Sequence, residues 1–398
     1  MSTGVTLARS SIAPLAPEPL APEPGASPPS LWLSRLALTD FRSYRELTIE
    51  PDPAPAVITG ANGSGKTNLL EAVSFLAPGR GLRRARLAEV ARNGTGAWSV
   101  AARVATPEGA VEIGTGRAAE AARERRLVKI DGKMEGAASG LAERLSLLWL
   151  TPEMDRLFTG SPSARRRFLD RLVFGLDPAH AQRLSAHDRA RRERARLLRE
   201  AGGDGAWLAA LERTMAEEGV AIAAARLDLV ARLGRELEAG DGPFPRARLE
   251  VAGGPEDLLR ETPALDAEER LAAQLARSRA RDAESGSAPG AHLSDLLVFD
   301  AASGRGAELC STGEQKALLI AVVLGQARLI RRRRKHTPLL LLDEIAAHLD
   351  EDRRRGLFAI LLELGGQVWM TGTDRAIFAP LEGRAQFFRV RNSVVLKG

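Results

Sequence analysis

The sequence predicts an α/β fold in which a helical second domain is inserted between the two halves of a sheet-containing domain. Three observations lead to this prediction. A short apolar run at residues 56–59 leads into a glycine-rich loop, and a second apolar run at residues 339–342 is followed by two acids. Between them, residues 178–281 are rich in Arg, Ala, Leu and Glu, and their apolar positions keep an approximate helical spacing.

The glycine-rich loop is a complete G-x-x-x-x-G-K-[ST] motif, which residues 60–67 fill as Gly-Ala-Asn-Gly-Ser-Gly-Lys-Thr. Its glycines permit backbone angles that other residues avoid, so successive N–H groups can wrap a polyphosphate. Strand, loop and helix signals follow in the required order, which favours a nucleoside triphosphate site over a chance glycine-rich turn. The dinucleotide fingerprint does not fit, because the glycines fall as G-x-x-G-x-G. The predicted nucleotide contacts here are Gly60, Ala61, Asn62, Gly63, Ser64, Gly65, Lys66, Thr67 and Asn68.

Lys66 and Thr67 have distinct expected roles at the end of this loop. Lys66 supplies a positive charge to the β and γ phosphates, and the Thr67 hydroxyl is a ligand for Mg²⁺. A helix that begins near Lys66 would point its positive N-terminal end at the same phosphates. Lys is scarce among the 57 basic residues of this chain, which makes a Lys at the motif position less accidental.

Composition sets the outer bounds. The chain has 398 residues, enough for two domains, and a net charge of +6. This charge favours an acidic partner such as nucleic acid, although an ordinary solvated surface is an open alternative. The single cysteine, Cys310, excludes an internal disulfide and a cysteine zinc site, which suits a reducing, cytoplasmic environment. No apolar run approaches the ~20 residues that a membrane span needs, so we expect no membrane partner.

The N-terminal part divides into a leader and the first half of the α/β domain. Residues 1–30 contain a Pro-rich duplication without an apolar core, which predicts a disordered leader rather than a signal peptide. Residues 31–177 form the first half. Alternating apolar residues predict strands near 33–38 and 47–49, and Val, Ile and Thr with Gly turns predict several short strands across 98–130.

The rest of the chain divides into the helical insertion and the second half of the α/β domain. Residues 178–285 form the insertion, with glycine-containing breaks near 202–205 and 239–254. Residues 286–398 form the second half, in which strand-like character returns at 296–299.

Two adjacent acids follow the second apolar strand. In open α/β sheets ligands gather at the carboxyl ends of strands, so Asp343 and Glu344 should meet the phosphate loop there. We expect Asp343 to bind Mg²⁺, directly or through water, and Glu344 to orient and polarise the attacking water. Glu344 and Lys66 are therefore the predicted catalytic residues, with Thr67 and Asp343 as metal ligands. A helix cap is the alternative explanation of the acidic pair.

A second anion site is predicted between these two motifs. Residues 310–316 read Cys-Ser-Thr-Gly-Glu-Gln-Lys and precede a helical run. Ser311 and Gly313 at a helix N-terminus offer a hydroxyl and free backbone N–H groups. One nucleotide does not need two such sites from one chain, so a head-to-tail pair is the economical explanation, with this segment closing over the γ-phosphate held by the partner. A plain helix cap is the alternative.

Together these motifs resemble the RecF family of ABC-type, SMC-like ATPases, over about residues 31–398. The resemblance implies an ABC-type P-loop ATPase head with ATP and Mg²⁺ as ligands, Arg42 near the nucleotide, and Asp350 facing the seam of a dimer. It rests on Asp-Phe-Arg-Ser-Tyr at 40–44, the loop and its continuation at 60–72, Gly160-Ser161-Pro162 with Arg165, Arg166, Phe168, Leu169 and Asp170, the segment 311–316, Asp343-Glu344, and Ala-His-Leu-Asp at 347–350.

The resemblance further implies an ATP-dependent homodimer that acts as a DNA clamp in recombinational repair and replication. Such a clamp binds single-stranded and gapped duplex DNA and assists RecA loading with RecO and RecR, and a weak, DNA-dependent ATPase resets the dimer. Three alternatives stay open: a nucleotide-locked DNA-binding scaffold with incidental turnover, another SMC-like or ABC-type ATPase, and the ATPase subunit of a transporter. The last predicts a much shorter insertion than the one between Gly60 and Ser311.

Arginine tracts are the candidate DNA contacts. Binding through them should weaken steeply with salt and show little base preference. For the tract at 183–199, a solvated helix face balanced by neighbouring acids is an open alternative. The candidates are Arg165, Arg166 and Arg167, then Arg191 and Arg192 within that tract, and the run at 331–334.

Some positions depart from the family pattern. Where ABC enzymes place a switch histidine, residues 371–374 read Thr-Gly-Thr-Asp, so hydrolysis is expected to be slow. Glu153 is the candidate for the Q-loop position, which lacks a glutamine. Residues 290–296 resemble the family's Gly-Pro-His-Arg-Asp-Asp-Leu but lack its Pro, its Arg and one Asp.

Overall fold

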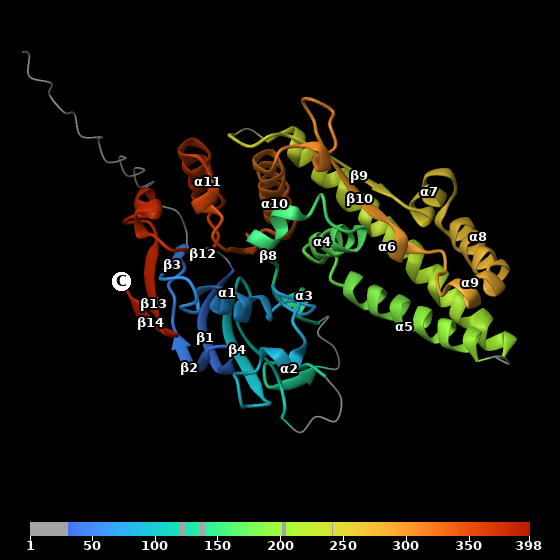
Figure 1. Ribbon diagram of the computed structural model, residues 1–398, viewed down its shortest axis with the longest axis horizontal. Coiled ribbons are helices and arrows are strands. Elements are labelled where there is room, and N and C mark those ends of the chain that lie inside the picture. The colour runs from blue at the N-terminus through green and yellow to red at the C-terminus, as the bar shows by residue number, and fades with distance from the viewer. Residues whose placement is uncertain (1–30, 120–124, 136–139, 201–203, 241) are drawn as a thin grey trace, which may run out of the picture.

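The computed structural model describes residues 31–119, 125–135, 140–200, 204–240 and 242–398. The predicted Pro-rich leader lies outside these ranges. The described molecule consists of two six-stranded sheets with their covering helices and a projecting helical part that carries a two-stranded ribbon (Figure 1). No helix in the ranges above is long and apolar enough to cross a membrane.

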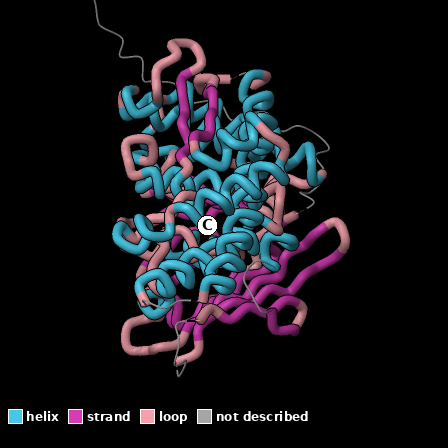
Figure 2. The backbone as a smooth tube through the Cα atoms, turned by 90° about the vertical axis from the view of Figure 1, so that its right-hand side faces the viewer, coloured by secondary structure: helices cyan, strands magenta, loops and turns pink. Residues whose placement is uncertain are grey.

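An antiparallel sheet with the strand order β2-β1-β4-β5-β6-β7 forms much of the N-terminal part. Its first two strands make a tight hairpin in which Phe41 pairs with Tyr44. The strands predicted near 33–38, 47–49 and across 98–130 are confirmed. In Figure 2 the strands of this sheet lie at lower right, beside a mass of helices. The bounds are β1 Trp32–Phe41, β2 Tyr44–Ile49, β4 Trp98–Thr106, β5 Gly109–Arg117, β6 Leu127–Ile130 and β7 Lys133–Glu135.

A mostly parallel sheet with the order β14-β13-β3-β12-β11-β8 forms the centre of the molecule. All its pairings are parallel except that of β13 with β14. The two predicted apolar strands become neighbours of β12 on either side, although far apart in sequence. The bounds are β3 Ala56–Thr59, β8 Leu147–Leu150, β11 Leu339–Leu342, β12 Val368–Gly372, β13 Gln386–Arg391 and β14 Val394–Lys397.

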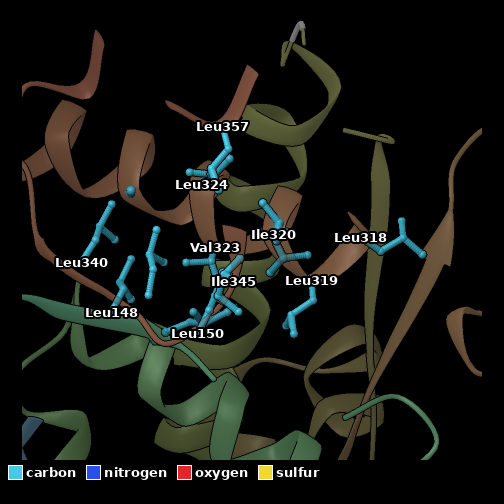
Figure 3. Packing of buried hydrophobic residues seen from close by; sticks show 14 of the residues in the cluster. Leu148, Leu150, Leu318, Leu319, Ile320, Val323, Leu324, Leu340, Ile345 and Leu357 are labelled. Atoms are coloured by element: carbon cyan, nitrogen blue, oxygen red, sulfur yellow. The ribbon is translucent and has the colours of Figure 1, made fainter. Parts of the chain in front are cut away.

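Two hydrophobic cores lie on the two faces of the parallel sheet. The four leucines of β11 are all buried and alternate between these cores, because successive strand residues point to opposite faces. A strand buried on both faces reads as a continuous apolar run, which is why this strand was predictable. On one face Leu148 and Leu340 pack near Ile320, Val323 and Leu324 (Figure 3).

Helices cover both faces. The antiparallel sheet and α1 share a core on one face, and α4, α10 and α11 share the core on the other. The helix predicted from Lys66 is confirmed, and the helical run predicted after the 310–316 segment is longer than expected. The helix bounds in this part are α1 Lys66–Ser74, α2 Leu87–Val90, α3 Leu141–Arg144, α4 Pro162–Phe174, α10 Thr312–Arg334 and α11 Glu351–Leu364.

The predicted helical insertion projects from this body as an arm (Figure 1). We use "arm" for the helices α5 to α9. The long helix α6 packs against α5 and α8 around a third, smaller core that includes Met215, Val220 and Leu271. The first two helices end and begin at Arg199 and Gly205, on either side of the predicted break near 202–205, of which residues 202 and 203 lie outside the described ranges. The bounds are α5 His180–Arg199, α6 Gly205–Glu238, α7 Gly254–Glu261, α8 Ala264–Arg277 and α9 Arg279–Ser285.

The break predicted at 239–254 hides a strand, which corrects the expectation of helices alone. Residues 247–252 form β9 (Ala247–Ala252), with inward Ala247, Leu249 and Val251 alternating with exposed residues. It pairs antiparallel with β10 (Asp295–Asp300), the strand predicted at 296–299. That strand therefore belongs to a separate ribbon and joins neither large sheet. The alternation was visible in the sequence, but the flanking glycines gave the stronger signal of a break.

A buried ionic cluster joins α4 to the arm. Arg226 of α6 is 1% exposed and donates to both carboxylate oxygens of Asp170, at 2.9 and 3.0 Å. Asp170 also bonds His180 Nε2 at 2.9 Å. Burial opposes ionisation of Asp170, but the hydrogen bond to His180 and the charge of Arg226 outweigh it and hold the pKa of Asp170 below its ordinary value. The carboxylate is therefore anionic and ties α4, α5 and α6 together.

Two neighbouring histidines give the fold a pH dependence. Burial, with help from the Arg191 and Arg226 charges, lowers the pKa of His187 to about 4, and burial does the same for His292. The unfolded chain binds protons near pH 6.5 and the folded chain only near 4, so stability should fall as pH drops through this window. Each histidine contributes up to about 1.4 kcal/mol per pH unit. The free energy of unfolding, measured with urea at several pH values from 7 to 4, should fall less steeply with falling pH in His187→Gln than in the wild type. An equal dependence on pH in the two proteins would contradict this.

Candidate functional site

The carboxyl ends of four parallel strands bring the predicted site residues together. The phosphate loop follows β3, Asp343 follows β11, Thr371 lies at the end of β12, and Thr151 follows β8. These strands are neighbours in one sheet and point the same way, so their ends share one edge. A cavity of about 350 Å³ at this edge is lined by the loop, both acids, Arg83 and Glu153.

The phosphate loop is held on two sides. Gly65 has φ +116°, and a Cβ there would lie 2.9 Å from the Tyr44 hydroxyl oxygen. That hydroxyl donates to the Gly65 carbonyl at 3.1 Å, and burial raises the pKa of Tyr44, so the donor keeps its proton. On the other side a Cβ on Gly60 would come within 2.4 Å of the Val390 carbonyl oxygen. Glycine is thus required at both positions for packing as well as for backbone angle.

Lys66 is 4% exposed and lies in the middle of this cavity's polar groups. Its ammonium group donates to the carbonyls of Gly60 and Ala61, at 2.8 and 3.1 Å, and lies 3.6 Å from Glu344 Oε1. The two predicted catalytic side chains are therefore neighbours, and their opposite charges offset each other at short range.

Thr67 and Asp343 meet as expected for two ligands of one cation. The Thr67 hydroxyl lies 3.0 and 3.1 Å from the two oxygens of Asp343. Burial raises the pKa of Asp343, while hydrogen bonds from Thr371 and Thr67 act against that rise. Hydroxyl and carboxylate oxygens are hard donors that suit Mg²⁺, which takes its other ligands from phosphates and water. The described ranges hold no cluster of three metal-ligating side chains that would suit a closed protein site instead.

Glu344 adopts a strained backbone conformation beside Asp343. Its φ of +53° is rarely adopted by a non-glycine residue and costs about 1–3 kcal/mol. The Thr371 hydroxyl accepts a hydrogen bond from the Glu344 amide at 2.9 Å and donates one to Asp343 at 2.7 Å. Thr371, which is 1% exposed, therefore fixes both acids at once. Its position was noted in the sequence only because it lacks a histidine, and no local pattern announced this role.

Arg83 is a site residue that the motifs did not reveal. It lines the cavity and donates to Asn68 at 2.7 Å and to the fully buried Glu71 at 3.1 Å. Arg42, predicted near the nucleotide, forms a bidentate pair with the same Glu71, at 2.7 and 2.9 Å. One carboxylate thus anchors two guanidinium groups beside the phosphate loop. An Arg-Gly-Leu-Arg-Arg run at 80–84 was the available signal for Arg83.

The other predicted nucleotide contacts do not line this cavity. Ser311 caps α10, accepting from the Glu314 amide while its own amide donates to the Glu314 carboxylate at 2.7 Å. Gly313 is exposed on the first turn of α10, and a Cβ on it would meet nothing within 4 Å. Asp350 caps α11 by accepting from the Arg353 amide at 2.8 Å. None of the three is among the residues that surround the loop's cavities in the described chain.

The predicted DNA-contacting arginines differ in their surroundings. Arg165 is paired with Asp295 at 2.6 and 2.8 Å and is largely buried, so its guanidinium braces β10 and is poorly placed for DNA. Arg166 donates to the Ser294 carbonyl at 2.7 Å. Burial, then the Arg84 and Arg166 charges, lowers the pKa of Arg167. Arg191 and Arg192 share Asp188 on the surface of α5.

Removing the Thr371 hydroxyl should slow turnover and leave ATP binding nearly intact. Thr371→Val keeps the shape of the side chain but removes both hydrogen bonds. The Glu344 amide then loses its side-chain acceptor, at a cost of about 1–3 kcal/mol. We expect kcat to fall about 5- to 150-fold with a KM change of less than about threefold. Steady-state kinetics should also show recovery in Thr371→Ser. Wild-type kcat in Thr371→Val would contradict the assignment.

The fold and the site define a P-loop ATPase head of the SMC and RecF type. The family model described as "RecF/RecN/SMC N terminal domain" matches residues 32–394. The chain belongs to the RecF family.

The similar proteins are full-length matches. The DNA replication and repair protein RecF of Mesorhizobium japonicum is 50% identical over 372 residues, which covers 92% of this chain and 98% of that protein. RecF of Rhizobium meliloti is also 50% identical over 372 residues, with 92% and 99% covered.

Solved structures show the same fold. The recombination mediator protein RecF-ATPrS of the RecFOR pathway has a TM-score of 0.81 at 21% identity, and the match covers 94% of this chain and 100% of that chain. The Smc head domain of Pyrococcus furiosus has a TM-score of 0.51 at 18% identity, with 92% and 96% covered. The predicted family and fold class are confirmed.

Proposed function

We propose that this protein is an ATP-dependent DNA clamp of recombinational repair and replication. ATP and Mg²⁺ bind at the carboxyl edge of the parallel sheet, two copies close head to tail, and slow hydrolysis opens the dimer. The observation that carries this proposal is that the nucleotide-binding motifs fall into two separate places in one copy. The loop, Asp343 and Glu344 share one cavity, whereas Ser311, Gly313 and Asp350 lie outside it.

Within one copy the roles follow from position. The amides of residues 60–65 and the Lys66 ammonium group hold the phosphates. Thr67 and Asp343 would hold Mg²⁺, which neutralises phosphate charge when bound. Glu344, 30% exposed in its side chain and facing the same cavity, orients the attacking water. Thr371 keeps Glu344 in place, and Arg83 adds positive charge at the cavity wall.

The second copy completes the site in this proposal. Ser311 and Gly313 present an exposed helix N-terminus, which favours a negative charge such as a γ-phosphate. Lys316, on the first turns of the same helix, lies 3.4 Å from Asp155 of the segment 152–156, and that segment also carries Glu153 into the nucleotide cavity. Nucleotide binding in one copy can thus reach the 311–316 segment of that copy through one ion pair.

DNA is the proposed macromolecular ligand. Relatives with half of their residues identical are named DNA replication and repair proteins. Burial and then the Arg80 charge lower the pKa of Arg84, and burial and then the Arg84 and Arg166 charges lower the pKa of Arg167. Phosphate would relieve this repulsion between like charges, and Arg191 and Arg192 on α5 are further candidate phosphate contacts. Single-stranded and gapped duplex DNA are the proposed forms, with RecR, and through it RecO and RecA, as protein partners.

The proposed organisation keeps the boundaries 31–177, 178–285 and 286–398, and a cytoplasmic location. The buried single thiol of Cys310 supports a reducing compartment. A nucleotide-locked scaffold with incidental turnover is the second candidate, and one observation favours it. The residue that contacts both acids is Thr371, which offers no imidazole for proton transfer.

Sedimentation velocity tests the proposal. We expect a monomer without nucleotide and with ADP, and a dimer with ATP that forms at lower protein concentration when a gapped duplex is added. The same distribution of monomer and dimer without nucleotide, with ADP, with ATP, and with ATP plus gapped duplex would contradict the clamp proposal. An ATP-specific dimer with no detectable turnover would favour the scaffold.

A further inference from the structure

A second cavity lies at the same sheet edge, on the other side of the phosphate loop. It measures about 870 Å³ and is lined by the loop at residues 59–64, by Thr373 and Arg375 after β12, and by residues 387–392 of β13 and its turn. Asn62 and Gly63 line both cavities, so the loop is the wall between them. Apart from the phosphate loop itself, no residue of the nucleotide site described above lines this second cavity.

Arginine dominates the charge of this cavity. Arg389 and Arg391 stand two positions apart on β13, so both project from the same face, and both are exposed. No hydrogen bond or ion pair in the described ranges engages either guanidinium. Arg375 lies over the Phe387 ring at 4.4 Å and 3.5 Å from Glu382. No Asp or Glu side chain lines the cavity.

The two unpaired arginines contrast with the arginines of α5. On α5, Arg191 and Arg192 share Asp188, and Arg196 bonds both Glu193 and Glu200. A guanidinium group in such a pair must give up its ion pair before it can bind a DNA phosphate. Arg389 and Arg391 carry no such cost, so they are better placed to meet an external anion.

We propose that this second cavity binds the phosphate backbone of a DNA strand through Arg389 and Arg391; the inference rests on the proposed DNA-binding function. Phosphodiesters carry one charge each and need no metal, which fits a lining that has three arginines and no Asp or Glu side chain. A nucleoside triphosphate arrives with Mg²⁺ and needs carboxylate or hydroxyl ligands like those of Thr67 and Asp343. A linear pair of arginines on a strand also suits a chain-like ligand.

The position of this site couples DNA to ATP. The turn after β13 contains Asn392 and Ser393, both with positive φ, and the Ser393 amide donates to the Ser64 carbonyl at 3.0 Å. The hairpin that carries the arginines is therefore bonded directly to the phosphate loop. Coupling between two sites is reciprocal, so DNA held on Arg389 and Arg391 should raise the affinity for ATP.

The test is binding of a fluorescent single-stranded oligonucleotide with ATP present, measured by anisotropy over a series of salt concentrations. The variant is Arg389→Gln with Arg391→Gln. Losing two phosphate contacts should weaken binding about tenfold or more and reduce the slope of log K against log salt by about 1.4. The DNA-induced gain in affinity for a fluorescent ATP analogue should also disappear.

The matched control is Arg35→Gln with Arg103→Gln. Arg35 and Arg103 lie on strands of the antiparallel sheet, and both side chains are 57% exposed. Replacing them removes the same net charge as the test variant does. We expect the control variant to have the wild-type slope of log K against log salt. The variant with Arg389→Lys and Arg391→Lys should keep most of that slope. A wild-type slope and affinity in the Gln pair would overturn the inference. Loss of ATP-analogue binding with DNA binding unchanged would also overturn it.

Photocross-linking on the unaltered protein provides a second measurement that does not depend on a variant folding. An oligonucleotide with 4-thiothymidine should cross-link to peptides from residues 373–392, and cross-links confined to other peptides would refute the site. Failure of the wild type to bind any DNA would instead contradict the proposed function, so the two failures are distinguishable.

Discussion

Replacing Glu344 with Gln should reduce kcat for ATP hydrolysis about 10²- to 10⁴-fold while leaving ATP affinity within about threefold of the wild type. The Gln side chain keeps the shape of Glu, and the backbone amide of this residue still donates to Thr371. The new side chain, however, can no longer accept a proton from water. The Lys66 ion pair is also lost, which frees the ammonium group for phosphate. Because hydrolysis opens the proposed dimer, this variant should remain dimeric and stay on DNA for longer.

Single-turnover kinetics and dissociation from labelled DNA after an ATP chase measure these two effects. Glu269→Gln is the control, since Glu269 is an exposed residue of α8 with the same chemical change. Both readouts should match the wild type in that variant. Unchanged turnover and unchanged DNA residence in Glu344→Gln would show that another group activates the water.

Replacing Asp170 with Ala should lower the free energy of unfolding by about 3–5 kcal/mol. The change leaves the Arg226 guanidinium, 1% exposed, and the fully buried His180 without their shared anion. Glu256 stays 3.6 Å from Arg226, but a buried guanidinium that loses its bidentate hydrogen-bonded partner is far more costly than the loss of a surface pair. Since α4, α5 and α6 meet at this carboxylate, the contact between the arm and the ATPase head should loosen first.

Urea denaturation at neutral pH measures the loss, and limited proteolysis locates it in the arm. Asp188→Ala is the matched control, because it removes an aspartate that also holds two basic partners but is 44% exposed. That change should cost less than about 1 kcal/mol. Equal losses in the two variants would mean that the buried cluster contributes no more than a surface pair.

The parts of the fold that the sequence predicted are those with strong local patterns. Residues 56–67 and 339–344 combine an apolar strand with chemistry that tolerates few substitutions, so strand, loop and role could be placed together. The parallel sheet adds what no local pattern contains. It sets β11 and β3 on either side of β12, and only that arrangement brings Thr371 against Asp343 and Glu344.

What the sequence did not reveal depended on long-range partners. The strand β9 was missed because its partner β10 lies more than forty residues later and the glycines around it indicate a turn. Arg165 was predicted to contact DNA from its place in an arginine run, and this stays a prediction; the sequence did not reveal its carboxylate partner Asp295, 130 residues away. Arginine runs specify charge, whereas the fold decides which guanidinium groups remain unpaired.

The most direct test of the split site is to mix two inactive variants. Lys66→Ala removes the phosphate contact of its own loop, and Ser311→Arg blocks the 311–316 segment with a bulky cation at an exposed helix cap. In a mixed dimer, one composite site combines the intact loop of one copy with the intact Ser311 of the other. Equal amounts should recover roughly a quarter of wild-type ATP turnover, since about half of the dimers are mixed and each has one intact site. Turnover no higher than the mean of the two variants alone would contradict a site shared between copies.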